Sequence, residues 1–465
     1  MRLADFENKT TVILGLGREG QSTWRYLRAA FPEKIFGLAD HLPLEKLGDE
    51  VVEMIRRDSR LRLHLGTDYL KSMAEYQVIV KSPGIPILLP EFGQAAQLGK
   101  RITSHTAIFF ANCPGRIIGV TGTKGKSTTA SLIHAILRQS LPKTFLVGNI
   151  GAPALDLLPE GDAATAFVYE LSSHQLIELQ QSPQTAVLHN IVPEHLDYYE
   201  SFDQYVAAKE NITRYQTTDD VLIYDADHKM PCDIASRSRA RRFGYSLEKP
   251  QQPGCFLEGD WIVWSSEESK REKVLRIQDV PLLGRFNLAN VAAAVAAGKL
   301  MGVANDKIAE GVQSFQPLEH RLELVGTYDE ITYYNDAIAT VPEATIAALD
   351  TLGETVETIL LGGADRQLDF SLLAKRLLES NIRTVILFPP TGKRIWDAIC
   401  GQEPSAPSRF AHLYVESMEQ AVSLAKQQTA KGKICLHSPA SPSFGLFRDY
   451  RERGEQFKQL VRESP

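Results

Sequence analysis

The chain is organised around the stretch Gly119-Val120-Thr121-Gly122-Thr123-Lys124-Gly125-Lys126-Ser127-Thr128-Thr129. An apolar run at residues 116–120 leads into it, and a pattern typical of a helix follows, with apolar side chains at residues 133 and 135–137. Glycines let backbone N–H groups curl around an anion, and the positive end of the following helix favours the same charge. A strand, a glycine-rich loop and a helix in this order predict a phosphate-binding loop.

The residue types within this loop predict ATP as the ligand. We expect Lys126 to reach the terminal phosphates, and the hydroxyl of Ser127 or Thr128 to bind Mg²⁺. The other predicted contacts in the loop are Gly122, Thr123, Lys124 and Gly125. The common form of the motif has a glycine at the position that Val120 occupies here. A glycine-rich turn without a ligand is the weaker alternative.

Length and composition are ordinary for a globular protein of several domains. With domains of roughly 100–200 residues, the 465 residues make three domains the simplest expectation. There is no apolar run of about 18 residues or signal-peptide core, and the five scattered cysteines lack metal-ligand spacing. We therefore expect a monomer in the reducing cytoplasm, with no membrane partner. A net charge of −6 gives no electrostatic case for nucleic acid.

The N-terminal block carries a second nucleotide motif. A predicted buried strand at residues 10–16 leads into Gly15-Leu16-Gly17-Arg18-Glu19-Gly20 and a helix, and the next strand ends at Asp40. This is the dinucleotide fingerprint, in which a carboxylate about 20 residues further on binds a ribose hydroxyl. The motif alone does not identify the nucleotide. A strand at residues 76–80 ends in Lys81-Ser82-Pro83-Gly84, a second turn able to face a ligand.

Two further blocks alternate strands and helices. The second has predicted strands at residues 116–120, 166–169 and 185–189, and a small β excursion at 231–280. The third has predicted strands at residues 332–334, 358–361, 384–388 and 433–436. We therefore predict an α/β fold of three consecutive domains. They are a Rossmann-like domain (1–102), a central P-loop ATPase-like parallel sheet (103–317) and a Rossmann-like C-terminal domain (318–465).

Three side chains that follow the phosphate loop suit metal and phosphate chemistry. Glu170 follows a predicted strand, His195 lies in the segment after the next one, and Lys209 lies in a predicted helix. If they converge on the loop, the carboxylate and imidazole hold Mg²⁺ and phosphates, and the lysine neutralises developing charge. Each has a structural alternative: a helix-cap carboxylate, a partly buried hydrogen-bonding histidine and a solvated lysine.

These motifs, in this order, resemble those of the Mur ligases over nearly the whole chain, and most of all the glutamate-adding members. Residues 119–129 resemble the family's ATP loop, residues 169–173 its magnesium-carboxylate motif and residues 190–197 its histidine motif. Tyr205-x-x-Ala208-Lys209 resembles the segment that bears a carbamylated lysine. The resemblance implies that Lys209, as a carbamate, holds a second Mg²⁺.

The resemblance also implies the remaining ligand contacts. For ATP these are Asn287, Arg321 and Asp336. For UDP-N-acetylmuramoyl-L-alanine they are Gly17, Arg18, Glu19, Asp40, His41, Ser82, Gly84 and Asn149. The implied reaction phosphorylates the alanine carboxylate, and the amine of glutamate then displaces the phosphate. The N-terminal block would hold UDP rather than NAD.

The expected glutamate pocket departs from the family pattern. Ile338 and Arg366 stand where lysines are usual. An acidic side chain still requires a cation, and Arg366 offers two parallel N–H donors. The residues expected around the amino acid are Thr340, Arg366, Ser443, Phe444 and Tyr450. We expect D-glutamate, the family's usual substrate, with L-glutamate as the alternative because the pocket has been rebuilt.

Three other interpretations compete with this one. An NAD-dependent oxidoreductase accounts for the fingerprint at residues 15–20 and for Asp40, but not for the ATP loop or the third block. A non-catalytic nucleotide-binding relative conflicts with the retention of Glu170, His195 and Lys209. Another Mur-type or folylpolyglutamate-type ligase is disfavoured by the N-terminal fingerprint and by the Arg453-Gly454 ending.

Overall fold

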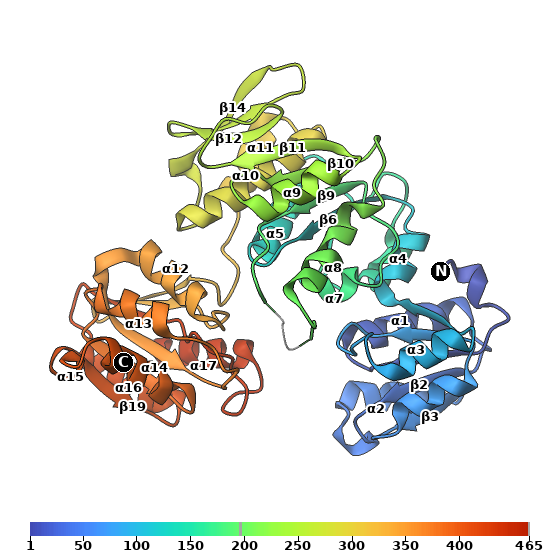
Figure 1. Ribbon diagram of the computed structural model, residues 1–465, viewed down its shortest axis with the longest axis horizontal. Coiled ribbons are helices and arrows are strands. Elements are labelled where there is room, and N and C mark those ends of the chain that lie inside the picture. The colour runs from blue at the N-terminus through green and yellow to red at the C-terminus, as the bar shows by residue number, and fades with distance from the viewer. Residues whose placement is uncertain (195–197, 464–465) are drawn as a thin grey trace. The chain divides into compact units, whose positions relative to one another are not determined.

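The computed structural model describes residues 1–194 and 198–463, and it contains three sheets of mostly parallel strands with helices packed beside them (Figure 1). The predicted α/β class with three nucleotide-type sheets is confirmed. Short 3₁₀ helices occur at Leu3–Phe6, Leu44–Lys46, Tyr69–Glu75, Leu158–Glu160, Ile277–Asp279 and Gly353–Thr355.

The first sheet has the strand order β3-β2-β1-β4-β5, with every pair parallel. Its strands are β1 (Thr11–Leu14), β2 (Phe36–Asp40), β3 (Leu61–Leu65), β4 (Val78–Lys81) and β5 (Arg101–Ser104). Its helices are α1 (Arg18–Ala30), α2 (Asp49–Arg57), α3 (Pro90–Gln97) and α4 (His105–Asn112). The order reverses between β1 and β4, and open α/β sheets bind ligands at such a reversal. Both nucleotide-type turns of this block follow these two strands.

The central sheet has the order β14-β13-β12-β11-β10-β9-β6-β8-β7. Its strands are β6 (Arg116–Thr121), β7 (Thr144–Gly148), β8 (Ala166–Glu170), β9 (Thr185–Leu188), β10 (Val221–Asp225), β11 (Arg241–Ser246), β12 (Gly254–Glu258), β13 (Trp261–Ser265) and β14 (Arg271–Arg276). Its helices are α5 (Lys126–Arg138), α6 (Ala154–Leu157), α7 (Ser173–Leu176), α8 (Phe202–Arg214), α9 (Lys229–Arg237), α10 (Arg285–Leu300) and α11 (Asn305–Gln313). The predicted β excursion forms the antiparallel edge β12 to β14, although α9 was not predicted.

The third sheet has the order β15-β16-β20-β17-β18-β19. Its strands are β15 (Glu323–Tyr328), β16 (Ile331–Asn335), β17 (Val356–Gly362), β18 (Thr384–Phe388), β19 (Ala411–Tyr414) and β20 (Ile434–His437). Its helices are α12 (Pro342–Leu352), α13 (Ser371–Leu378), α14 (Thr391–Gln402), α15 (Ala406–Arg409), α16 (Met418–Gln428) and α17 (Tyr450–Arg462). Along β17, Ile359 and Leu361 belong to one apolar core and Leu360 to another, so both faces of this sheet are covered.

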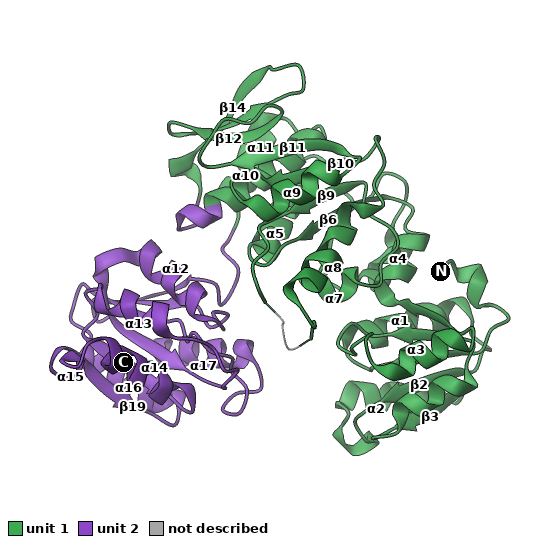
Figure 2. Cartoon of the chain, in the orientation of Figure 1, with its two compact units in different colours: residues 1–280, 288–315 green, residues 281–287, 316–465 purple. Residues whose placement is uncertain are grey.

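The chain divides into two compact units (Figure 2). The first comprises residues 1–280 and 288–315 and holds the first two sheets, and the second comprises residues 281–287 and 316–465. The predicted boundary at residue 102 lies inside β5, and the three domain limits remain a prediction. Among the described residues, no helix has the length and apolar character needed to cross a membrane.

Helix α11 lies close against α5 because it has a glycine at the contact. A Cβ atom on Gly311 would lie 2.7 Å from the Ile136 Cα and 3.0 Å from its backbone nitrogen. Backbone cannot move aside as the end of a flexible side chain can. Gly93 provides a comparison, because it is exposed in α3 and a Cβ there would meet nothing within 4 Å.

We predict that Gly311→Ala lowers the free energy of unfolding by about 1–3 kcal/mol, since it forces two packed helices apart. Gly93→Ala should instead raise it by about 0.5–1 kcal/mol, because alanine loses less backbone entropy in a helix. Denaturant unfolding of the two variants beside the wild-type chain measures both values. Equal shifts would contradict this account of the α5–α11 contact.

Candidate active site

The phosphate loop joins β6 to α5, and two of its glycines have backbone angles that favour glycine. Gly122 has a φ of 145° and Gly125 a φ of 88°. A Cβ on Gly122 would lie 2.5 Å from the Cβ of His189, so a side chain there would collide with the neighbouring segment. The Thr123 N–H donates to the Asn190 carbonyl at 2.9 Å. The loop is thereby held against the chain that leaves β9.

A hydroxyl and a carboxylate lie beside the loop where a magnesium site is expected. Ser127 Oγ donates to Glu170 Oε2 at 3.0 Å, because β6 and β8 pair with Val120 opposite Glu170. Of the two candidate hydroxyls, that of Ser127 contacts Glu170, whereas that of Thr128 is buried without a hydrogen-bond partner among the described residues. Oxygen ligands of these kinds suit Mg²⁺. Ser172, rather than Glu170, caps α7, so the helix-cap alternative for Glu170 is wrong.

Two lysine side chains reach into the loop from different elements. Lys126 Nζ donates to the Thr123 carbonyl at 2.9 Å, and Lys209 Nζ, from α8, donates to the Gly122 carbonyl at 2.7 Å. Lys209 is only 1% exposed and lies over the ring of Tyr205, so the solvated alternative is wrong. Burial, assisted by the charge of Lys126, holds the pKa of Lys209 well below its usual value. The neutral amine thus favoured is the form that reacts with carbon dioxide.

The histidine motif is only partly visible. His195 lies outside the described residues, so its predicted metal role stays a prediction. Glu194, the residue directly before His195, forms an ion pair with Lys124 through Oε1 and Nζ, 2.7 Å apart. This pair joins the phosphate loop to the segment that follows β9.

One cavity of about 770 Å³ in the first unit brings the two nucleotide motifs together. It is lined by Lys126 and Lys209 and by all eight residues expected to contact the muramoyl substrate: Gly17, Arg18, Glu19, Asp40, His41, Ser82, Gly84 and Asn149. Substrate contact by these residues remains a prediction. The cavity nevertheless places the N-terminal fingerprint and the ATP loop on a single open space.

Asp40 has a structural contact that the fingerprint did not predict. Its carboxylate accepts hydrogen bonds from the Leu16 N–H at 2.7 Å and the Leu42 N–H at 2.9 Å. Gly15 has a φ of 84°, and a Cβ there would lie 2.9 Å from Ser82. Asp40 and Gly15 therefore set the shape of the glycine-rich loop, while both still line the cavity.

Sequence reasoning missed several residues that line or support this cavity. His174 and Tyr198 line it with their rings edge to face, 4.2 Å apart between centroids. Tyr205 also lines it and hydrogen-bonds Thr123 through its hydroxyl. The Asn290 side chain, from α10, accepts from the Thr129 hydroxyl at 3.3 Å. The spacing of Tyr205 from Lys209 was one sequence signal for a residue of this set.

The three other residues expected to contact ATP belong to the second unit. Asp336 is buried and accepts from the Leu322 N–H and from Ser438 Oγ, and burial raises its pKa to about 6. Arg321, the residue directly before Leu322, is half-buried. Asn287 is also buried, and its side chain donates to the Leu283 carbonyl at 2.6 Å.

Of the residues expected around glutamate, Thr340, Arg366, Ser443 and Phe444 lie in connecting segments of the third sheet, and Tyr450 is the first residue of α17. Arg366 lies 6.0 Å from the ring of Phe444, which is 55% exposed. Arg453 is buried and donates to the carbonyls of Ala337 and Ser441, so it joins the segments that carry Thr340 and Ser443. Tyr450 lies edge to face with His320, at 6.0 Å between centroids. Amino-acid binding by these residues remains a prediction.

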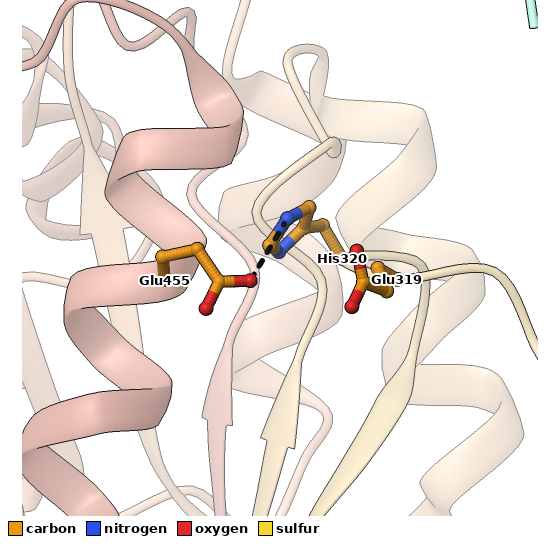
Figure 3. A group of neighbouring side chains, drawn as sticks. All are labelled: Glu319, His320 and Glu455. Carbon is orange, nitrogen blue, oxygen red and sulfur yellow. Dashed lines mark ion pairs between the residues drawn. The ribbon is translucent and has the colours of Figure 1, made fainter.

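A group of acidic and imidazole side chains in the second unit has the composition of a metal site but contains a lysine. Figure 3 shows Glu319, His320 and Glu455 close together. Lys458 Nζ lies 2.7 Å from Glu455 and 3.5 Å from Glu319, and it also pairs with Glu323 at 3.1 Å. The carboxylates therefore surround an ammonium group, and we assign this cluster to ion pairing.

Comparisons with known proteins identify the family. The description "Mur ligase middle domain" matches residues 120–298, and "Mur ligase, glutamate ligase domain" matches residues 320–441. A UDP-N-acetylmuramoylalanine–D-glutamate ligase of Symbiobacterium thermophilum is 34% identical, with 97% of each chain covered. One from Roseiflexus sp. is 36% identical, covering 86% of this chain and 87% of its own. The chain therefore belongs to the Mur ligase family.

Solved structures support the same fold. The UDP-N-acetylmuramate-alanine ligase MurC of Thermotoga maritima has a TM-score of 0.62 at 17% identity, covering 98% of this chain and 100% of its own. A MurF structure from Acinetobacter baumannii has a TM-score of 0.61 at 14% identity, covering 97% and 93%. At these identities the likeness concerns the fold alone.

We predict that Glu170→Gln removes most of the magnesium dependence of nucleotide binding, because an amide oxygen carries no charge for the ion. Calorimetry with a non-hydrolysable ATP analogue, with and without Mg²⁺, measures the effect. The expected result is a wild-type affinity that Mg²⁺ strengthens and a variant affinity that it leaves nearly unchanged. An undiminished response to Mg²⁺ in the variant would contradict the assignment.

Proposed function

We propose that this chain is a cytoplasmic, monomeric ligase that uses ATP to join D-glutamate to UDP-N-acetylmuramoyl-L-alanine, a step of peptidoglycan precursor synthesis. The observation that carries the proposal is that one cavity is lined by the N-terminal fingerprint, by Lys126 of the phosphate loop and by Lys209 of α8. Such a cavity accommodates a ligand whose nucleotide lies at one motif and whose reacting end lies at the other. The names of the full-length relatives support the same substrates.

In this proposal the phosphate loop makes the first step possible by positioning and by charge. A carboxylate is a poor electrophile, and bound ATP supplies the phosphoryl group that activates it. Lys126 and the N-terminal end of α5 stabilise negative charge on the phosphates. Ser127 and Glu170 would hold one Mg²⁺, and a carbamate on Lys209, with His195, would hold a second. Burial lowers the pKa of Lys209 and so favours the neutral amine, which supports carbamate formation.

The second unit receives the amino acid. The amine of the amino acid attacks the activated carbonyl carbon and gives up a proton to solvent, the amide bond forms, and phosphate leaves with the bonding electrons. Arg366 would pair with the side-chain carboxylate, since Ile338 has no charge. The exposure of Arg366 beside Phe444 keeps its planar donors accessible from solvent.

Ligation assays with the two glutamate enantiomers test the proposed function. We expect ATP-dependent phosphate release with UDP-N-acetylmuramoyl-L-alanine and D-glutamate, and little with L-glutamate. Lys126→Ala should lower this turnover by at least about 100-fold, because the loop loses its cation for the terminal phosphates. Circular dichroism serves as the control for folding of the variant. Turnover confined to L-glutamate would overturn the choice of enantiomer, and turnover with neither would overturn the function.

A second prediction concerns the modification of Lys209. Wild-type protein labelled with ¹³C-bicarbonate should show a carbamate carbonyl resonance that Lys209→Ala lacks. The variant should lose most activity, and short carboxylic acids should restore part of it by occupying the place of the carbamate. Full activity in the variant, or an identical spectrum, would exclude the carbamate.

A further inference from the structure

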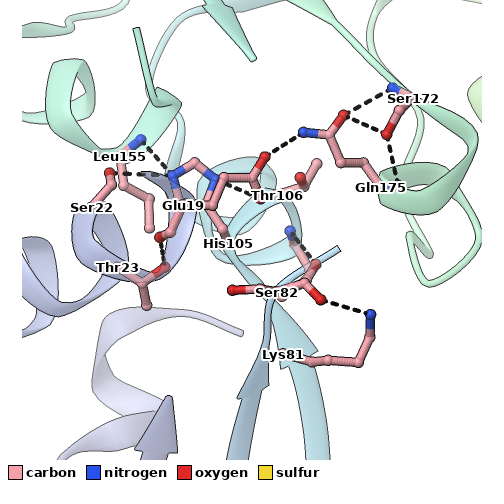
Figure 4. A network of polar contacts seen from close by, with 12 residues as sticks. Glu19, Ser22, Thr23, Lys81, Ser82, His105, Thr106, Leu155, Ser172 and Gln175 are labelled. Carbon is pink, nitrogen blue, oxygen red and sulfur yellow. Dashed lines mark hydrogen bonds and ion pairs between the residues drawn. The ribbon is translucent and has the colours of Figure 1, made fainter. Parts of the chain in front are cut away.

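The two sheets of the first unit are joined by a buried polar network that includes one residue of the glycine-rich loop. Figure 4 shows Glu19, from the first turn of α1, facing His105 of α4 and Gln175 of α7. Gln175 Nε2 donates to Glu19 Oε1 at 2.5 Å. His105 Nδ1 lies 3.8 Å from Glu19 Oε2. The carboxylate therefore contacts a helix of the first sheet and a helix of the second.

The orientation of Gln175 is fixed by a capping box. Its carbonyl oxygen accepts from the Ser172 N–H at 2.8 Å and from Ser172 Oγ at 3.1 Å. Its NH₂ group is thus the part that faces Glu19. Ser172 lies two residues after Glu170, whose carboxylate contacts Ser127. A continuous set of contacts therefore runs from the glycine-rich loop to the turn beside the magnesium-type site.

The orientation of His105 follows from its other nitrogen. His105 Nε2 accepts from the Leu155 N–H at 3.3 Å, so the proton of the neutral ring lies on Nδ1, facing Glu19. Burial lowers the pKa of His105 to about 3, so the ring is neutral. Both groups that face Glu19 therefore carry an N–H, but only Gln175 donates a hydrogen bond to the carboxylate, since His105 Nδ1 lies 3.8 Å from Oε2, beyond hydrogen-bond distance. Such surroundings suit an ionised carboxylate, which only accepts hydrogen bonds.

Burial opposes the ionised form that these donors favour. It raises the pKa of Glu19 to about 7, against the opposing effects of Gln175, Arg18 and Lys81, while Glu178 adds to the rise. The Lys81 and Glu178 side chains form their own ion pair at 2.6 Å in the same network. A carboxylate that lines a cavity although burial disfavours its ionised form indicates a functional role.

We propose that Glu19 is a positioning residue for the UDP-bearing substrate. Its ionised carboxylate, held by Gln175, keeps the glycine-rich loop in register with the turn that follows Glu170. The proposal rests on the proposed function, because it takes the cavity to be the site of a UDP-linked substrate. Glu19 acts through Gln175 and Ser172 rather than on the reacting atoms.

The ionisation of Glu19 makes stability and activity change in opposite directions with pH. Its folded pKa lies above the unfolded value, so the folded state binds more protons between about pH 4.5 and 7. The contribution of Glu19 to stability therefore rises as the pH falls through this window. Activity should fall over the same window, because protonation removes the negative charge that strengthens the hydrogen bond from Gln175 to Glu19.

Glu19→Gln tests the proposal, because it removes the charge while keeping an acceptor for Gln175. We expect kcat/KM for the UDP substrate to fall by about tenfold, as misplacement of supporting groups does, with the KM for ATP unchanged. The wild-type decline in kcat/KM below about pH 7 should be absent from the variant. At pH 8 its thermal midpoint should rise by about 2 °C or more, since a buried charge has been removed. A residue with only a structural role would not gain stability while losing activity.

Two further variants keep the test decisive. Glu19→Asp retains the charge but is too short to reach Gln175, so it should lose activity as Glu19→Gln does. Arg25→Gln is the matched control, since the exposed Arg25–Asp156 ion pair also joins the two sheets and lies outside the cavity lining. An equal loss in Arg25→Gln, or unchanged kcat/KM and pH profile in Glu19→Gln, would overturn the proposal. Absence of ligation by the wild-type chain would instead overturn the proposed function, and UDP calorimetry separates the two cases.

Discussion

The register of β6 with its two neighbours is the constraint on which the candidate site depends. Val120 lies opposite Glu170 on β8, and Thr121 lies opposite Leu188 on β9. The phosphate loop, the carboxylate and the segment after β9 therefore leave the sheet at one edge. A shift of one residue would turn Glu170 to the opposite face of the sheet, because side chains alternate with a period of two. Backbone hydrogen bonds thus set the distances between the chemical groups.

Much of this arrangement could be predicted from the sequence, for reasons that differ between elements. Strands β1, β4 and β9 are buried along their whole length, and such strands appear as continuous apolar runs. Strand β3 was missed because its side chains are half-buried or exposed, so its apolar residues form no unbroken run. Strand β19 was missed for the same reason.

Residues of the candidate site could be predicted where a short stretch of neighbouring sequence indicates their role. Lys126 follows from its glycine-rich surroundings, and Lys209 from its resemblance to a known segment. Gln175 was not predictable, because its partner Glu19 lies 156 residues away and the contact forms only when two sheets pack together. Tyr198 was missed because its contact with His174 depends on the path of the chain after β9.

The strand order of the third sheet has a consequence for how the chain folds during synthesis. Strand β20 lies between β16 and β17, yet it is made after β19, the strand at the far edge. Strands β17 to β19 can pair as they emerge, whereas β16 finds its parallel partner only when β20 has left the ribosome. Pairings between distant segments form slowly and expose unpaired edges meanwhile. The second unit therefore depends more than the first on protection from aggregation before its last strand arrives.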